Sequence, residues 1–425
     1  MSNRAKALLL FFIDIGILFL ALTIAISIRS SELSQHYLLF CGIFPFWILM
    51  FFIEGLYTLR TYNPANLPIS VIRSIFLSVL ISIIIIYLLP QNGTDLTPKT
   101  NLVLTALIAL PMMYVWRKCF FSFFARDRRL RETVLIGSEE TLTMVKEEIE
   151  NKPHLGYKII STGNEIPSET KLIAIERNYV DKDLYQKIFS LLGSVEIIDL
   201  AQFAEKISGK IPIKAIDAAW FIEYCGHQES RSYDFLKVMI DKSTAIILLF
   251  VLIPVAAVLF PILLIFHGRP LIFKQIRTGL NNKPFKLYKL RSMVVDAEKH
   301  GAQWAKPGDA RVTRIGKFLR KTRLDELPQL INIIRGEMSL VGPRPERPEM
   351  IEKNLAPNIP FYKLRHLVKP GVTGWAQVTF RYGFSTEDSK EKLQYDLYYV
   401  KNRSLWLDLL VFLKTIKTVI SGAGQ

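Results

Sequence analysis

This chain of 425 residues is poor in cysteine and has fewer acidic than basic residues. Its three cysteines lie far apart, with no CxxC or cysteine–histidine spacing, which argues against a disulfide framework, a zinc site and thiol catalysis. Aspartate and glutamate number 38 against 54 lysines and arginines, which gives a formal net charge of +16. This excess favours anionic partners such as phospholipid headgroups, nucleotides or polyprenyl phosphates, and charge alone also leaves nucleic acid open.

Long apolar runs fill the first quarter of a chain in which half of all residues are hydrophobic. Four runs, 8–28, 37–53, 71–89 and 102–121, have about the length of a membrane-spanning helix. The first is too long for a cleaved signal peptide and lacks its small-residue exit. Asp14 within that run is expected to face other helices, because an acid in lipid is costly.

Basic residues flank these runs unevenly. They cluster at Arg4 and Lys6, at Arg60 and Arg73, and at Arg117, Lys118, Arg126, Arg128, Arg129 and Arg131. The alternate loops carry little beyond Arg29 and Lys99. The pattern predicts that the N-terminus and everything after the fourth run are cytoplasmic.

Residues 133–223 change to an alternating soluble pattern. Short apolar runs at 133–136, 158–160, 171–175 and 195–198 are interspersed with helical stretches at 139–150 and 181–192, which indicates a small open parallel sheet. In its first turn, Glu139 stands where a dinucleotide site needs a second glycine, and Glu140 follows. Two acids would repel phosphate, so we expect a Rossmann-like domain without nucleotide, used for assembly or regulation.

A fifth apolar segment, 243–266, has lysines before it and basic residues after it, so both ends look cytoplasmic. Pro254 near its centre and Pro261 further on would bend a helix. A helix that enters one leaflet and returns fits both facts. A kinked fifth span is the alternative, because prolines are tolerated in spanning helices.

Two amphipathic stretches follow. In 311–321, one apolar helical face is surrounded by cations, which suits an anionic membrane interface, although charged surface helices are also common. The final helix, 405–420, could rest on lipid or pack against the rest of the domain.

Two adjacent acids, Asp325 and Glu326, follow the first amphipathic stretch at a predicted helix start. Neighbours on a helix point about 100° apart, so the two carboxylates can take different roles. One could attack phosphorus, and the other could hold Mg²⁺ that neutralises a diphosphate. Arg344 and Arg381 are candidates for forked contacts to phosphate oxygens. By spacing alone, a helix-capping pair is the better explanation of the two acids.

Several long motifs occur in one order: 273–279, 285–293, 324–330, 336–345 and 364–378. Together they resemble the bacterial sugar transferases, and specifically the monotopic phosphoglycosyl transferases. The resemblance covers nearly all of 233–424. The first four runs and the α/β region resemble, more loosely, the large subfamily of undecaprenyl-phosphate glucose or galactose phosphotransferases.

The resemblance implies transfer of a sugar 1-phosphate from a UDP-sugar to undecaprenyl phosphate, with release of UMP. Asp325 would be the nucleophile that forms a covalent aspartyl phosphosugar, and Glu326 would hold Mg²⁺. The residues implied to bind substrate are Lys289, Arg344, Arg381 and Asp396. Pro254 matches the kink of the family's re-entrant helix, but Ile253 precedes it where a serine is frequent. A structural ion pair is the alternative for Lys289, Arg381 and Asp396, and His366 is expected to be structural.

We therefore expect a membrane protein of mixed α and α/β class. A four-helix transmembrane bundle would occupy 1–125, a Rossmann-like parallel α/β domain 126–228, and a mainly helical monotopic catalytic domain 229–425, with its re-entrant helix at about 243–266. The expected location is the bacterial inner (cytoplasmic) membrane, multi-pass, with the catalytic domain facing the cytoplasm.

Expected partners are a UDP-sugar, undecaprenyl phosphate, membrane lipids, a second copy of the chain in a homodimer, and downstream glycosyltransferases, but no nucleic acid. The reaction would be the first membrane step of exopolysaccharide, capsule or O-antigen synthesis. A non-catalytic membrane scaffold or regulator of polysaccharide assembly is the alternative. The residues do not indicate which sugar is moved.

Overall fold

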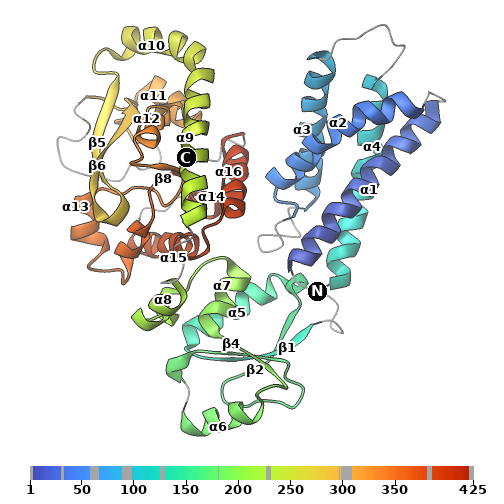
Figure 1. Ribbon diagram of the computed structural model, residues 1–425, viewed down its shortest axis with the longest axis vertical. Helices are drawn as coiled ribbons and strands as arrows, with labels where there is room; N and C mark the ends of the chain where they lie inside the picture. Colours follow the sequence, from blue (N-terminus) through green and yellow to red (C-terminus); the bar gives the residue numbers. More distant parts are fainter. Residues whose placement is uncertain are drawn as a thin grey trace. The chain divides into compact units, whose positions relative to one another are not determined.

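The computed structural model describes residues 3–29, 33–57, 67–88, 98–124, 130–179, 181–225, 231–295, 297, 309–380 and 385–420. The chain divides into two compact units, Met1–Gly209 and Lys210–Gln425 (Figure 1). Each is taken by itself below.

Four helices open the first unit and match the four predicted apolar runs: α1 (Asn3–Arg29), α2 (Leu33–Ile53), α3 (Leu67–Leu88) and α4 (Pro98–Phe124). Three stretches, Ala5–Ile28, Leu67–Tyr87 and Lys99–Phe124, are long and apolar enough to cross a membrane. The apolar part of α2, Tyr37–Ile53, is shorter. The chain is therefore a membrane protein with three such helices in this unit and a shorter fourth that packs with them.

Asp14 lies inside this bundle, as its cost in lipid predicts. Its side chain is fully buried, and its Oδ2 lies 2.5 Å from Nη2 of Arg117 on α4. Arg117 also donates from Nη1 to the Leu56 carbonyl at 2.7 Å. A buried acid is tolerated here because a guanidinium from another helix neutralises it.

The α/β part contains a fully parallel sheet in the order β2-β1-β3-β4. Its strands are β1 (Arg131–Ile136), β2 (Tyr157–Thr162), β3 (Leu172–Ile175) and β4 (Glu196–Asp199), and its helices are α5 (Glu139–Glu150), α6 (Lys182–Ser190) and α7 (Leu200–Ser208). Alternate strand residues pack into two apolar layers, one on each face of the sheet, because successive side chains point to opposite faces. Leu135 packs with Val145 and Phe203, and Val134 with Leu184. The predicted parallel sheet is confirmed.

The start of α5 is held by an internal carboxylate. Oε2 of Glu176, directly after β3, accepts hydrogen bonds from the N–H of Ser138 at 2.8 Å and from its hydroxyl at 3.0 Å. A Cβ at Gly137 would lie 2.5 Å from Leu200 and 2.7 Å from Glu176, so this turn is tightly filled. An anion at a helix N-terminus is electrostatically favourable. Here a side chain supplies it, which adds a physical reason to the prediction of no nucleotide.

The second unit is mainly helical, with two small two-stranded sheets. Its helices are α8 (Ala218–Cys225), α9 (Arg231–Val251), α10 (Ile253–His267), α11 (Arg314–Lys321), α12 (Gln329–Ile334), α13 (Pro348–Met350), α14 (Trp375–Thr379), α15 (Thr386–Asn402) and α16 (Leu405–Ile420). Antiparallel β5 (Ile272–Thr278) and β6 (Pro284–Leu290) form one sheet, and parallel β7 (Ser339–Val341) and β8 (Gly371–Thr373) the other.

The fifth apolar segment is a bent pair of helices. The chain bends by 61° between α9 and α10, and Pro254 is the second residue of α10. The prediction placed Pro254 inside one helix; it instead begins a second helix, because a first-turn proline sacrifices no helical hydrogen bond. Pro261 lies in the interior of α10.

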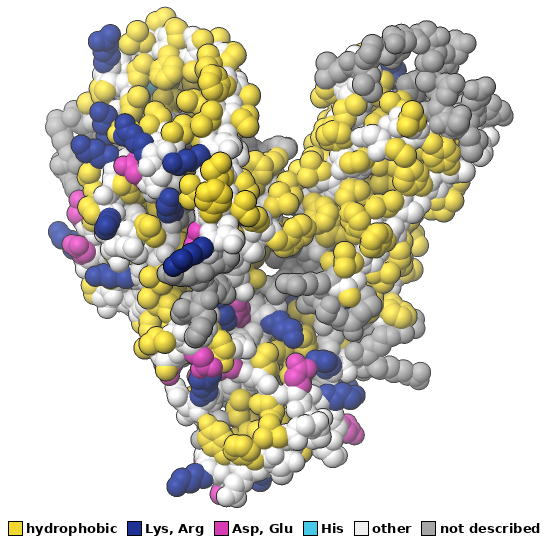
Figure 2. All heavy atoms as spheres, in the orientation of Figure 1, with side chains coloured by type: hydrophobic (Ala, Val, Ile, Leu, Met, Phe, Trp, Pro, Cys, Tyr) yellow, Lys and Arg dark blue, Asp and Glu magenta, His cyan; other side chains and the backbone are white. Residues whose placement is uncertain are grey.

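Both arms of the bent pair pack against the rest of the second unit. Ala245 of α9 is buried with Leu330 and Ile333 of α12. Leu263 of α10 is buried with Leu290 of β6 and Leu319 of α11. The opposite sides remain apolar and exposed, and hydrophobic side chains cover the end of this unit formed by α10 (Figure 2).

Candidate active site

Asp325 and Glu326 lie in a single 3-10 turn, Leu324–Glu326, between α11 and α12. The sequence predicted that they begin a helix, but α12 begins at Gln329, after Pro328. Because proline has no N–H, it cannot donate back into the turn, which ends with the bond from Leu327 N–H to the Leu324 carbonyl. The acids therefore belong to a separate tight turn.

Glu326 is buried among three cations. Its Oε1 lies 3.3 Å from Nη1 of Arg344, 3.3 Å from Nη1 of Arg323 and 3.8 Å from Nζ of Lys289. Burial by itself would raise the pKa of Glu326, but Arg344, Lys289 and Arg323 outweigh it and lower the pKa. This carboxylate is therefore ionised and acts as the counterion of the site.

Asp325 has a different environment. Its side chain is buried, and within the part of the chain that the structure describes no hydrogen-bond donor reaches its Oδ1. Burial raises its pKa, against the attraction of Lys289, while the neighbouring charge of Glu326 raises it further. Arg320 and Arg323 also favour its ionised form. A poorly solvated carboxylate beside cations is chemically suited to nucleophilic attack.

A pocket of about 220 Å³ opens beside the acids. It is lined by Arg277, Leu287, Lys289, Gln329, Arg344, Pro345 and Gly371. Burial and the nearby charge of Arg344 lower the pKa of Lys289 to about 8, although Glu326 and Asp325 act in the opposite direction. This space is continuous with solvent, and the three cations that line it, Arg277, Lys289 and Arg344, suit an anionic group such as a phosphate.

The turn that carries Arg344 follows β7 and is held through its backbone. Arg365 donates from Nη2 to the Arg344 carbonyl at 3.0 Å, and Arg277 donates from Nη1 to the Pro345 carbonyl at 3.0 Å. At Gly342 a Cβ would lie 2.3 Å from the Lys369 carbonyl, so only glycine allows this close approach to the segment before β8. The Arg344 side chain is thus aimed by a rigid frame.

The remaining predicted site residues lie elsewhere. The Asp396 carboxylate is buried on α15, where its Oδ2 lies 2.7 Å from Nη2 of Arg365, so it contacts the pocket's frame and does not line the pocket. Arg381 lies outside the described residues. Pro254 is at the bend between α9 and α10, and His366, also buried, pairs through Nδ1 with Asn282 at 2.7 Å.

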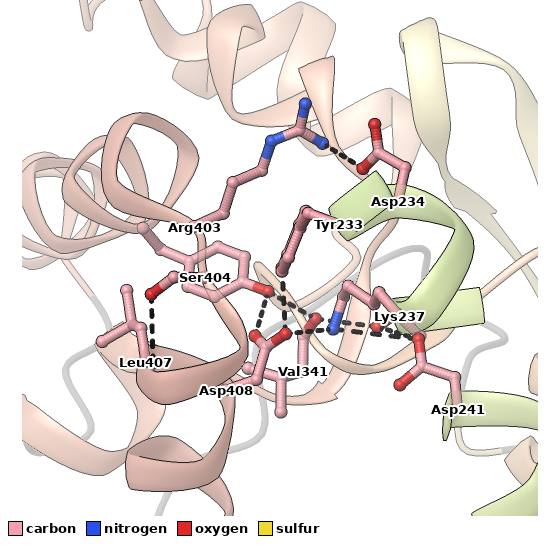
Figure 3. A network of polar contacts seen from close by, with 11 residues as sticks. Tyr233, Asp234, Lys237, Asp241, Val341, Arg403, Ser404, Leu407 and Asp408 are labelled. Atoms are coloured by element: carbon pink, nitrogen blue, oxygen red, sulfur yellow. Dashed lines mark hydrogen bonds and ion pairs between the residues drawn. The ribbon is translucent and has the colours of Figure 1, made fainter. Parts of the chain in front are cut away.

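A second polar network ties α9 to this frame (Figure 3). Asp408 of α16 accepts hydrogen bonds from Tyr233 and Lys237 of α9, each at 2.9 Å, and from the Tyr399 hydroxyl at 2.6 Å. Tyr399 also lies 3.0 Å from the Val341 carbonyl, three residues before Arg344. The base of the bent helix pair and the arginine turn therefore share one scaffold.

Sequence reasoning missed several residues of this site: Arg277, Arg323, Arg365 and Asp408. Arg277 and Arg365 lie within motifs that resemble the family, and Arg323 immediately precedes one. Their place in or beside these motifs could have marked them as candidates. Other arginines lie nearby in the sequence, however, and only the contacts in the folded chain show which of them belong to the site.

Asp325 and Glu326 are the carboxylates that a magnesium ion could use at this site. The described residues contain no group of three or more His, Cys, Asp and Glu side chains placed to hold a metal. Mg²⁺ needs only one or two carboxylates when phosphate oxygens and water complete its shell. Glu326, whose pKa is lowered by the cations around it, supplies one such carboxylate.

Comparison with known proteins identifies relatives of the second unit. The family described as "Bacterial sugar transferase" matches residues 232–422. The uncharacterized sugar transferase EpsL of Bacillus subtilis (strain 168) is 39% identical over 198 residues, 44% of this chain and 89% of the relative.

Two relatives with named activities also match. The UDP-N-acetylgalactosamine-undecaprenyl-phosphate N-acetylgalactosaminephosphotransferase of Aeromonas hydrophila is 39% identical over 233 residues, 55% of this chain. The match covers only 54% of that relative's length. The UDP-galactose-lipid carrier transferase of Erwinia amylovora is 28% identical over 368 residues, 76% of this chain and 75% of the relative. With an acid turn, a cationic pocket and these matches, the chain belongs to the bacterial sugar transferase family.

Proposed function

We propose that this protein transfers a sugar 1-phosphate from a UDP-sugar to undecaprenyl phosphate, producing undecaprenyl-diphosphate-sugar and UMP. The observation that carries the proposal is the pairing of a buried, unpartnered Asp325 oxygen with a pocket lined by cations. The names of the Aeromonas and Erwinia relatives support it, since each is named as a transferase of a UDP-sugar to a lipid acceptor. These names differ in the sugar, so the sugar is left open.

The reaction would take place in two displacements at one phosphorus. The Asp325 carboxylate attacks the phosphorus that bears the sugar, and the bond from that phosphorus to UMP breaks, so the electron pair leaves with UMP. A phosphate oxygen of undecaprenyl phosphate then attacks the same phosphorus. The bond to Asp325 breaks and the carboxylate is restored, so a difficult displacement is divided into two easier ones.

The basic side chains of the site have different roles in this proposed reaction. Arg344 and Lys289, which form ion pairs with Glu326 here, would turn to phosphate oxygens when the diphosphate enters. Asp396 would act through Arg365, which fixes the backbone of Arg344. The expected phosphate contact of Arg381 belongs to the proposal as well.

Glu326 would hold Mg²⁺, with phosphate oxygens and water completing the shell. The ion would neutralise charge on the diphosphate and on the departing UMP. The cations around Glu326 favour its ionised form, which is the form a metal ligand requires.

The bent pair α9 and α10 would be re-entrant, which brings the acceptor lipid to the acids. In a spanning helix, the two ends would lie on opposite sides of the membrane. Here Asp241 of α9 accepts a hydrogen bond from Ser339 at 2.7 Å, and Leu263 of α10 packs on Leu319 of α11. Both arms thus contact one folded body, which supports a hairpin whose outer apolar side enters one leaflet.

Helix α11 would mark the membrane surface beside this hairpin. Its buried Leu319 faces α10, while Arg314, Lys317 and Lys321 are exposed next to Phe318, which is 55% exposed. Cations flanking an apolar side chain suit an anionic interface. With the positive flanks of α1 and α4, this supports a catalytic unit on the cytoplasmic face of the bacterial inner membrane.

The direct test incubates the purified protein in lipid nanodiscs with radiolabelled UDP-sugars and undecaprenyl phosphate. The expected result is label in the lipid fraction and stoichiometric UMP. No lipid-linked label from any of UDP-glucose, UDP-galactose, UDP-N-acetylglucosamine or UDP-N-acetylgalactosamine would favour the scaffold alternative.

A further inference from the structure

Three cations converge on the pocket from separate elements. Arg277 lies on β5, Lys289 on β6, and Arg344 on the turn after β7. In the β5–β6 pairing, Phe273 faces Lys289 and Arg277 faces Phe285. Alternate strand residues share a face, so Arg277 and Lys289 lie on the same side of the hairpin.

Arg277 differs from the other two cations in its surroundings. Lys289 and Arg344 both lie within 4 Å of Glu326, whereas the carboxylate beside Arg277 is Glu346, at 3.6 Å. Among the described residues that line the pocket none is acidic, and Glu346 is not one of them. Arg277 is therefore a third cation of the pocket, outside the pair of pocket cations that contacts Glu326.

The guanidinium of Arg277 is also fixed in position. It donates to the Pro345 carbonyl at 3.0 Å and to Oε1 of Gln275 at 2.6 Å, and its side chain is 16% exposed. A guanidinium presents five N–H groups in a planar fork, a geometry that matches the oxygens of a phosphate. Because its position is set before a ligand arrives, little side-chain entropy is lost on binding.

A diphosphate carries two phosphate groups, and the proposed reaction treats them differently. Lys289 and Arg344, which contact the acid turn, would face the phosphate that Asp325 attacks. We infer that Arg277 binds the phosphate of the nucleoside monophosphate that departs, and so sets affinity for the donor and for UMP. The inference rests on the proposed function and adds a residue to the donor side of the site.

Two variants test this residue against a matched control. Arg277→Gln removes the charge, and Arg277→Lys keeps a charge but loses the fork. Lys274→Gln removes one charge from the same strand at an exposed position on its opposite face. Each full-length protein is assayed in nanodiscs for the KM of the UDP-sugar, the KM of undecaprenyl phosphate and inhibition by UMP, after thermal unfolding has shown that it is folded.

For Arg277→Gln, we expect the UDP-sugar KM and the UMP inhibition constant to rise about tenfold to a hundredfold, as for loss of a charged hydrogen bond. Arg277→Lys should lie between this variant and the parent, and Lys274→Gln should match the parent. The KM for undecaprenyl phosphate should not change. A purely structural role in the arginine turn would instead weaken donor and acceptor alike, and that outcome would overturn the inference, as would an unchanged UMP constant.

Direct titration of UMP into the Asp325→Asn protein separates this inference from the proposed reaction. Binding there needs no turnover, so a tenfold weaker affinity on adding Arg277→Gln supports the nucleotide contact even if no sugar is transferred. Equal UMP affinity with and without Arg277, in a protein whose parent transfers sugar, rejects the inference and leaves the reaction standing.

Discussion

Nη1 of Arg344 lies 3.3 Å from Oε1 of Glu326, so the turn after β7 and the acid turn before α12 meet in one ion pair. The Glu326 side chain is 9% exposed and the Arg344 side chain 32%, so the acid is enclosed while the cation still reaches solvent. In the proposed reaction, Arg344 would exchange this carboxylate for an incoming phosphate without moving far.

Replacing the proposed nucleophile should abolish transfer. Asp325→Asn keeps the size of the side chain but removes the attacking charge, so we expect the rate to fall about 10⁴-fold or more. Intact-mass spectrometry after mixing with UDP-sugar alone should detect a sugar-phosphate adduct on the parent and none on the variant. Glu352→Gln, at an exposed position, is the control. Appreciable turnover by Asp325→Asn would refute covalent catalysis.

Glu326→Gln should chiefly change the response to Mg²⁺. The amide is a weaker ligand for a hard cation, so we expect the Mg²⁺ concentration for half-maximal rate to rise at least about tenfold. The measurement is a Mg²⁺ titration of transfer at fixed UDP-sugar, together with UMP release. An unchanged titration curve would remove Glu326 from the metal site.

The rate should depend on pH through Lys289. Burial and the charge of Arg344 lower the pKa of Lys289 to about 8. The side chain is therefore positively charged below pH 8 and loses this charge as the pH rises through that value. We therefore expect the KM for UDP-sugar to rise above about pH 8. Lys289→Arg should shift this alkaline limb upward, because a guanidinium stays charged.

The fall in rate at low pH should report protonation of the carboxylates. Burial raises the pKa of Asp325, so the nucleophile becomes protonated at a higher pH than an ordinary aspartate, and the acid limb should lie above the usual range. Initial rates from pH 4 to 10 for the parent and for Lys289→Arg supply both limbs. An alkaline limb that stays in place in Lys289→Arg would show that another group causes it.

Both ends of the α9–α10 pair should label from the same face of the membrane. In a background with Cys41, Cys119 and Cys225 replaced, Arg231→Cys and Arg269→Cys should react with a membrane-impermeant maleimide on the same side as Glu352→Cys. Phe250→Cys, exposed at the bend, should be protected by lipid. Labelling of the two ends from opposite faces would favour a kinked span.

Much of the architecture could be predicted from the residues alone. The apolar runs, the alternating strands from β1 to β4 and the proline bend depend on local order along the chain, so length and periodicity were sufficient. Two details differed from the prediction: the helix break at Leu252 and the separate 3-10 turn that holds Asp325. In both places a proline limits where a helix can begin, and only the folded backbone shows whether the helix lies before or after that proline.

The sequence by itself predicted the residues of the proposed site, namely Asp325, Glu326, Lys289, Arg344, Arg381 and Asp396. Only the tertiary structure decided their neighbours. The structure shows that Arg277 lines the pocket, and that Asp396 does not line it but forms an ion pair with Arg365. The physical reason is that burial, charge and distance arise between segments far apart in the chain, and a side chain's solvation and partners are set by that packing rather than by its place in a motif.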